Sequence, residues 1–313
     1  MCAATSLPAA TLESYLASAP FKMPMVPVPS FSDRRFPITD FGAVGDGHTL
    51  DTAAFAKAID ACAAAGGGHV IVPAGLWLTG PIALKSTVDL HAERGALVQF
   101  TSDHTAYPMA PRDDRGLYAA SCLSAVGQRD FALTGDGIYD GAGDTWRPVR
   151  KTKTTDAEWQ RLLAKGGVTS NEGTNWWPTK EAMTGEDYLA ELAKKTAHPT
   201  AEEMLPARDF RRSAMVAFTG CDDVLVEGVT LRNSPSGLFV PARCTNLTVR
   251  YATLLNEWSA QNGDGMDIGP CKNVVVYRCT VSAGDDAICM KASGKSPWPG
   301  EPGLQNVIVA ECA

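Results

Sequence analysis

The sequence predicts an all-β chain that folds as a right-handed parallel β-helix with an N-terminal capping helix and a partly helical insert. Two observations predict this fold. Short apolar strands recur along most of the chain, and from residue 130 onward they form a repeat that opens each time with Asp or Asn. A unit of this size cannot bury a hydrophobic core alone, so copies must stack on one another.

The repeat has four clear copies, which begin at Asp130, Asp223, Asn246 and Asn273. The last three starts are 23 and 27 residues apart. Because short polar side chains tolerate left-handed backbone and bond to nearby backbone groups, the four first residues are expected to form a ladder of turns. Apolar residues follow at one, three and eight positions after each start: Phe131, Leu133, Ile138; Val224, Val226, Leu231; Leu247, Val249, Leu254; Val274, Val276, Val281.

The N-terminal part predicts how the solenoid begins. Residues 1–35 are rich in Pro, Ala and Ser and are expected to form an extended lead-in, whereas residues 36–313 form a single β-helix domain. Residues 36–44 alternate enough for a strand. A helix over about 51–65 has apolar residues at helical spacing and ends at Gly66–Gly68, so it can cover the first coil. Short strands are then expected near 69–72, 77–79, 88–90 and 97–100.

Residues 144–210 interrupt the repeat and contain two amphipathic, helix-like stretches near 156–163 and 186–195. Insertions in solenoids often lie on the binding face. Aromatic rings beside cations would suit an anionic sugar. An insert that packs on its own tryptophans beneath a solvated basic face is an equal alternative. The aromatic and basic residues concerned are Trp146, Arg147, Arg150, Lys151, Lys153, Trp176 and Trp177.

A fifth copy of the repeat begins at Asn306, and its third core residue would be number 314. A solenoid end exposes strand edges and apolar core unless something covers it. We therefore expect further C-terminal coils that are missing from this sequence.

Composition limits the classes of function. The chain has 313 residues, of which 45% are hydrophobic and 20% charged, so it can bury a large core. It has no apolar run of 18 residues, so no membrane span is expected, and no signal peptide is visible. The net charge of −7 argues against nucleic acid as a partner and means that a polyanionic substrate would need a local basic pocket. Nothing in the sequence indicates the oligomeric state.

The nine cysteines lack metal-binding spacing. Cys221, Cys244 and Cys271 each lie two residues before a repeat start, which predicts a ladder of small buried thiols. Stacked neighbours could also form a disulfide.

The strongest functional signal is a set of three aspartates, Asp264, Asp285 and Asp286. Aligning the apolar runs 266–268 and 288–290 places Asp264 over Asp286 on the adjacent coil, 22 residues away. Stacked strands lie about 4.8 Å apart, so the ionised carboxylates repel and the pKa of at least one should rise. The three are expected to face solvent only if turns at Gly263 and Gly284 break the strand alternation.

Three readings of these aspartates compete. Acidic residues in Gly-rich sequence are often surface turn formers, and clustered carboxylates also suit Ca²⁺. Inverting glycoside hydrolysis needs one protonated acid at the leaving oxygen and a carboxylate that holds water on the opposite face. Asp264 and Asp286 could hold that water, and Asp285 could donate the proton. We favour this third reading.

The motifs Asn262-Gly263-Asp264 and Gly284-Asp285-Asp286 resemble the two acidic signatures of glycoside hydrolase family 28, the polygalacturonase family. The resemblance extends from about Phe36, although the block at 38–47 and 66–75 is shared with other pectin-lyase-like solenoids and supports fold more than activity. It implies inverting hydrolysis of α-galacturonosyl linkages, with Asp285 as general acid, Asp264 and Asp286 activating water, and no cofactor or metal.

The same resemblance implies a pectic polysaccharide or oligogalacturonide as substrate and an extracytoplasmic location, periplasmic or secreted. We expect Asn262, Lys291, Trp146, Arg147 and Arg150 to bind this substrate. The long insert resembles that of bacterial members with narrowed clefts, which favours attack at chain ends. The family's downstream Gly-His-Gly and Arg-Ile-Lys motifs do not occur in this sequence, so this chain alone could be inactive.

Two other functions fit a β-helix. A polysaccharide lyase would use a cation and an Arg or Lys base, and would release unsaturated products. A non-catalytic β-helix would bind carbohydrate or serve a structural role. The paired acids at 285 and 286 opposite Asp264 favour hydrolysis.

Overall fold

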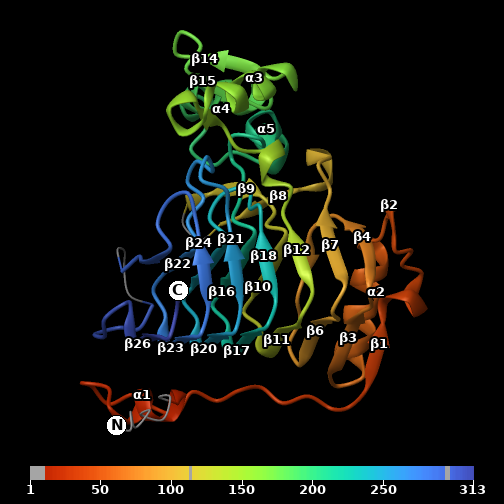
Figure 1. Cartoon of the computed structure of the whole chain (residues 1–313), viewed down its shortest axis with the longest axis vertical. Helices are drawn as coiled ribbons and strands as arrows, with labels where there is room; N and C mark the ends of the chain where they lie inside the picture. The colour runs from red at the N-terminus through yellow and green to blue at the C-terminus, as the bar shows by residue number, and fades with distance from the viewer. Residues whose placement is uncertain (1–10, 113–114, 293–296) are drawn as a thin grey trace, which may run out of the picture.

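Three parallel sheets run side by side along the molecule and enclose one hydrophobic core, as a parallel β-helix requires (Figure 1). The computed structural model describes residues 11–112, 115–292 and 297–313. Each coil contributes one strand to each of two or three sheets, so consecutive coils stack through backbone hydrogen bonds.

The first sheet has the strand order β1 (Arg35–Pro37), β3 (Gly68–Val72), β6 (Val88–Ala92), β11 (Arg129–Gly135), β17 (Asp222–Glu227), β20 (Thr245–Arg250), β23 (Lys272–Tyr277), β26 (Gln305–Ala310). The second has the order β2 (Asp46–Leu50), β4 (Gly75–Thr79), β7 (Ala96–Phe100), β12 (Ile138–Asp140), β18 (Thr230–Arg232), β21 (Thr253–Leu255), β24 (Thr280–Ser282). The third has the order β25 (Ile288–Met290), β22 (Met266–Ile268), β19 (Phe239–Ala242), β16 (Val216–Thr219), β10 (Leu123–Val126), β5 (Ile82–Ala83).

The predicted repeat is confirmed by the strand register. Phe131, Val224, Leu247, Val274 and Val307 pair in succession across the first sheet. The first four of these side chains are fully buried. The stacked apolar columns are therefore the core of the solenoid.

One predicted core position is wrong by a single residue. Tyr139, and not Ile138, pairs with Leu231 and is fully buried. Strand β11 has seven residues and β17 has six, which shifts the inward position from the eighth to the ninth residue after the start.

The first residues of the repeats form the predicted turn ladder. Asp130, Asp223, Asn246, Asn273 and Asn306 all have φ between 52° and 59°. The side-chain amide of each Asn donates to the preceding member, at 2.7 Å to Asp223, 2.8 Å to Asn246 and 2.9 Å to Asn273. One column of short polar side chains thus holds the same corner of successive coils.

The capping helix is also confirmed. Helix α2 (Thr52–Ala64) lies across the first coils and buries the apolar positions predicted for it, including Phe55 and Ile59 (Figure 1). The strand expected over 36–44 is shorter than predicted. After β1 the chain turns into a 3₁₀ helix (Ile38–Phe41) that ends at Gly42, whose φ is +93°.

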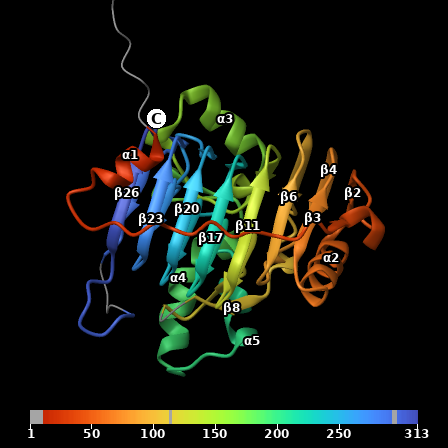
Figure 2. The same cartoon turned by 90° about the horizontal axis from the view of Figure 1, so that it is seen from below.

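The lead-in is only partly extended, because residues 12–17 form helix α1 (Leu12–Ala17). Figure 2 shows this N-terminal arm crossing the outer face of the first sheet from β26 to β1. Leu12, Tyr15 and Leu16 pack on Val275 and Tyr277 of β23 and their neighbours. The Tyr15 hydroxyl donates to Glu311 at 2.5 Å.

The insert forms a separate layer above the β-helix (Figure 1). The helix predicted near 186–195 begins six residues earlier, where Thr179 accepts a hydrogen bond from the Ala182 amide as N-cap. The elements of this layer are β13 (Val149–Arg150), a 3₁₀ helix (Lys151–Lys153), α3 (Asp156–Ala164), β14 (Val168–Ser170), β15 (Asn175–Trp177), α4 (Lys180–Ala193), and α5 (Ala201–Met204). The hairpin of β8 (Met109–Pro111) and β9 (Leu117–Ala119) lies below it.

Two further observations complete the fold. Cys221, Cys244 and Cys271 are fully buried free thiols, so the ladder of small side chains is present without disulfides. Among the described helices, none is both long and apolar enough to cross a membrane.

The turn ladder can be tested by replacing Asn273. Asn273→Ala removes two ladder hydrogen bonds and forces a Cβ-bearing residue without a local acceptor into left-handed backbone. We expect a loss of roughly 2–4 kcal/mol in the free energy of unfolding, measured by urea denaturation. Asn273→Gly should lose less, because glycine adopts this conformation freely. Equal losses in the two variants would contradict a backbone contribution.

Candidate active site

The two acidic motifs lie on turns that enter adjacent strands of the third sheet. Met266 pairs with Ile288 and Ile268 with Met290, which is the predicted register. The Gly265 amide donates to the Asp286 carbonyl at 2.9 Å, so the backbone beside Asp264 contacts the backbone of the next acidic motif. The sequence therefore places both motifs on neighbouring coils, as expected.

Both turns require glycine because the backbone is crowded there. A Cβ at Gly263 would lie 2.5 Å from the Ala260 Cβ, and one at Gly284 would lie 2.4 Å from the Glu257 carbonyl oxygen. The turn at Gly263 breaks the strand alternation, and the Asp264 side chain lines a surface pocket instead of the core.

The three predicted carboxylates have different surroundings. Asp264 is 9% exposed, whereas Asp285 and Asp286 are exposed on the turn before β25 and are not among the residues that line the pocket. The Lys291 ammonium lies 3.4 Å from the Asp264 carboxylate and 3.2 Å from the Asp267 carboxylate. The structure thus groups Asp264 with a carboxylate that the sequence argument had not singled out.

Burial, followed by the neighbouring carboxylate of Asp267, raises the pKa of Asp264 to about 6. Lys291 opposes this shift, and Asp285 adds to it. An enclosed carboxylate beside a second carboxylate is easier to protonate than a solvated one, which accounts for the direction of the shift at Asp264. The predicted pKa elevation is present, although Asp267 contributes more to it than Asp285.

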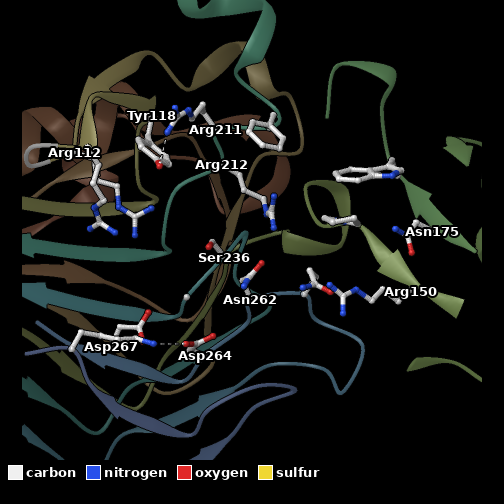
Figure 3. Close-up of a pocket in the computed structure, with 17 residues that line it drawn as sticks. Arg112, Tyr118, Arg150, Asn175, Arg211, Arg212, Ser236, Asn262, Asp264 and Asp267 are labelled. Atoms are coloured by element: carbon white, nitrogen blue, oxygen red, sulfur yellow. Dashed lines mark hydrogen bonds and ion pairs between the residues drawn. The ribbon is translucent and has the colours of Figure 1, made fainter. Parts of the chain in front are cut away.

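The pocket beside Asp264 is strongly basic. Its volume is about 580 Å³, and five arginines and Lys291 line it together with two carboxylates, Asp264 and Asp267 (Figure 3). The chain as a whole carries a net charge of −7. Positive charge is therefore concentrated at the site. This is the local basic pocket that an acidic protein needs in order to bind an anionic substrate.

Three segments far apart in the sequence supply the arginines. The β8–β9 hairpin contributes Arg112 and Arg115, β13 of the insert contributes Arg150, and the segment before β16 contributes Arg211 and Arg212. In Figure 3 the hairpin and the segment before β16 lie on one side of the pocket and the insert on the other.

Two of these arginines are held in place by specific contacts. Arg211 donates to the Tyr118 hydroxyl at 2.6 Å, and its guanidinium lies 4.7 Å from the ring centre. Arg212 donates to the Pro235 carbonyl at 2.9 Å. Burial lowers the pKa of Arg212 to about 10, so it remains charged at neutral pH.

The predicted substrate-binding residues divide into two groups. Asn262, Lys291 and Arg150 line the pocket. Trp146 and Arg147 do not, because they are 1% and 2% exposed at the base of the insert. The Trp146 ring stacks on His104 with centroids 3.5 Å apart. The expectation that these two residues contact substrate is therefore wrong for this structure.

The tryptophans of the insert also divide. Trp177 lines the pocket, whereas Trp176 is buried with Val149 and Trp159 in a small core of the insert. The insert thus packs on some of its own tryptophans, and binding of an anionic sugar by Trp177 stays a prediction.

The sequence argument missed Arg112, Arg115, Tyr118, Arg211 and Arg212. The available signal was local: two short segments rich in arginine within an acidic chain. Within the described part of the chain, no three or more His, Cys, Asp or Glu side chains are arranged to hold a metal ion.

The raised pKa of Asp264 can be tested by measuring how the stability of the fold changes with pH. The native state binds this proton more tightly than the unfolded chain, whose ordinary value is 3.8, so ionisation destabilises the fold as pH rises from about 4 to about 6. Asp264→Asn removes this cost. We expect its melting temperature, relative to the original chain, to be higher at about pH 7.5 than at about pH 4. An identical difference at both pH values would contradict the raised pKa.

Comparison with known families and proteins agrees with this geometry. Residues 206–310 match the family model of glycosyl hydrolases family 28. Residues 36–96 match a second model, rhamnogalacturonase A/epimerase, pectate lyase-like. The first match covers both acidic motifs, and the second covers the N-terminal block that the sequence argument linked to fold.

Several similar proteins of known name are polygalacturonases or related galacturonosidases. An exo-poly-alpha-D-galacturonosidase of Dickeya chrysanthemi is 29% identical over 282 residues, which is 85% of this chain and 43% of that protein. A probable polygalacturonase of Vitis vinifera is 28% identical over 82% of this chain and 44% of its own length.

Among solved structures, a hyperthermoactive exopolygalacturonase of Thermotoga maritima is similar to this chain with a TM-score of 0.65 and 30% identity. The match covers 84% of this chain and 55% of that one. The chain thus spans about half the length of these relatives. The coils that carry both acidic motifs lie within the segment that matches the family model of glycosyl hydrolases family 28.

Proposed function

We propose that this protein hydrolyses α-galacturonosyl linkages in a pectic polysaccharide, with inversion at the anomeric carbon. The observation that carries this proposal is the arginine-lined pocket beside Asp264, on an acidic chain whose two acidic motifs lie on adjacent coils. Guanidinium groups match carboxylates in geometry and charge, so the pocket suits a uronic acid better than a neutral sugar.

The roles assigned to the aspartates are those that the family resemblance implies, and the placement of Asp264 supports its role as base. Asp264 is largely enclosed and has a pKa of about 6, so above that pH it is an ionised base that can hold a water molecule. Asp286 lies on the next coil and accepts a second hydrogen bond from that water. Asp285 is exposed beside the pocket and donates its proton to the leaving oxygen.

The remaining lining residues orient the sugar. Lys291 keeps Asp267 and Asp264 in one network, and Asn262 lies at the mouth of the turn that carries Asp264. Arg150 approaches from the insert, opposite Arg211 and Arg212 (Figure 3). Basic groups on facing walls can bind carboxylates of successive galacturonate units.

Attack at chain ends fits the arrangement of these walls. The insert and the β8–β9 hairpin flank the pocket, which limits its extent along a polymer. The similar proteins named above include an exo-poly-alpha-D-galacturonosidase and an exopolygalacturonase. Because pectic polymers lie outside the cell, the site of action is extracytoplasmic, in a periplasm or after secretion.

A lyase on the same fold is the second candidate, since a pocket rich in arginine could also supply a base. The two reactions differ in their products. Hydrolysis releases saturated reducing ends, whereas elimination releases unsaturated sugars that absorb in the ultraviolet. Both signals should be followed on polygalacturonate and on a rhamnogalacturonan, with and without a chelator. Rising absorbance that depends on calcium would overturn hydrolysis in favour of elimination.

Asp285→Asn tests the acid. The variant keeps the shape of the side chain and loses the proton donor, so we expect turnover to fall by about 10²–10⁴-fold. Binding of trigalacturonate, measured by calorimetry, should change little because the pocket is intact. Unchanged turnover in a folded variant would remove Asp285 from the mechanism and favour a non-catalytic role.

Arg150→Met tests carboxylate binding and is best measured in the Asp285→Asn background, where substrate stays intact. One charged hydrogen bond at an exposed position is lost, so the dissociation constant for trigalacturonate should rise about 5–30-fold, equivalent to about 1–2 kcal/mol. Arg94→Met is the matched control, since Arg94 is exposed and paired with Asp136 outside the pocket. The idea fails if both variants bind alike or if a neutral galactose trimer binds equally well.

A further inference from the structure

The first ten residues of the insert contact turns that adjoin both acidic motifs. Two cations of this segment, Arg147 and Lys153, do not line the arginine-rich pocket. Each instead contacts backbone or side-chain oxygens of neighbouring turns. Lys153 bonds directly to the residue before Asp285, and Arg147 is linked through Asn256 to the residue before Asp264.

Arg147 is a buried connection between three turns. One terminal nitrogen donates to the Ser234 carbonyl and lies 3.4 Å from the Asn256 side-chain oxygen. The other donates to the Asn233 side chain at 3.1 Å and lies 3.7 Å from the Glu257 carboxylate. A guanidinium that is 2% exposed and bonded in several directions fixes its partners more strictly than an exposed one would.

Asn256 extends this connection to the first acidic motif. Its side-chain oxygen accepts from the Ser234 amide at 2.9 Å, and its amide donates to the Gly263 carbonyl at 2.9 Å. Gly263 directly precedes Asp264. The chain of contacts from Arg147 through Asn256 therefore ends one residue before the proposed base.

Lys153 makes the equivalent contact with the second acidic motif. Its ammonium donates to the Gly284 carbonyl at 3.2 Å and lies 4.0 Å from the centre of the Trp258 ring. Gly284 directly precedes Asp285. Because the Gly284 backbone packs against the carbonyls of Glu257 and Trp258, this lysine contacts the same group of turns that Arg147 contacts.

We infer that Arg147 and Lys153 are positioning residues that set the placement of Asp264 relative to Asp285. This inference rests on the proposed function. In an inverting hydrolase the distance between acid and base must leave room for the water. A misplacement of about 1 Å can cost about 10²-fold in rate. The insert would then contribute to catalysis through its root as well as to binding through Arg150.

Lys153→Met is the principal test, with Lys151→Met as control because Lys151 is exposed on the same 3₁₀ helix. We expect kcat on trigalacturonate to fall about 10–100-fold in the first variant while KM changes less than about 3-fold. Lys153→Arg should restore most of the rate, since it can still donate to Gly284. Equal kcat in the Lys153→Met and Lys151→Met variants would overturn the inference.

Replacing the buried Arg147 risks unfolding the chain. Asn256→Ala therefore tests the chain of contacts from Arg147 to Gly263. This variant cuts the link to Gly263 without altering the insert. The expected result is again a lower kcat with little change in KM. A rise in KM alone would indicate a role in binding and would contradict positioning.

Amide hydrogen exchange separates this inference from the proposed function, because it needs no activity. Lys153→Met should speed exchange in peptides that cover residues 256–265 and 283–290, relative to Lys151→Met, and leave the first sheet unchanged. If the original chain shows no hydrolysis, the proposed function fails while this measurement still decides whether the link exists. Unchanged exchange in both peptides would overturn the link even in an active enzyme.

Discussion

The stacking of one coil on the next in a constant register is the constraint on which the rest of the structure depends. A slip of one residue would turn every core side chain of a coil toward solvent. The column of polar residues at Asp223, Asn246, Asn273 and Asn306 prevents such a slip, since each must adopt left-handed backbone and bond to the one before it. The same register brings the turns of Asp264 and Asp286 together, so the geometry of the site follows from the regularity of the core.

Most of the fold could be predicted from the sequence because its determinants are local and repeated. The repeat starts, the capping helix and the pairing of Met266 with Ile288 all depend on short patterns. The same reasoning failed where long-range packing decides. Nothing near Trp146 or Arg147 in sequence shows that His104 and Ser234 will enclose them. The arginine-lined pocket was missed for the same reason, since its walls come from three segments that only the fold brings together.

The insert differs from the solenoid in how it acts on the site. The β-helix supplies a rigid platform, and its coils repeat without regard to chemistry. The insert breaks this regularity and supplies charged groups in two settings. Arg150 lines the pocket, while Arg147 and Lys153 bond to turns around the acidic motifs. One short segment therefore supplies both a pocket residue and the residues that contact the turns of the β-helix. Changes to that segment affect the pocket and these turns together.

The N-terminal arm has a consequence for the order of folding. Its hydrogen bond from Tyr15 to Glu311 joins residues 296 positions apart, and its apolar side chains rest on β23 and β26. Coils of a solenoid can form one after another as neighbours become available. The surface on which the arm packs is incomplete until β26 is in place, and contacts of such sequence separation form slowly. The residues of the arm are thus synthesised long before the strands that complete their native contacts.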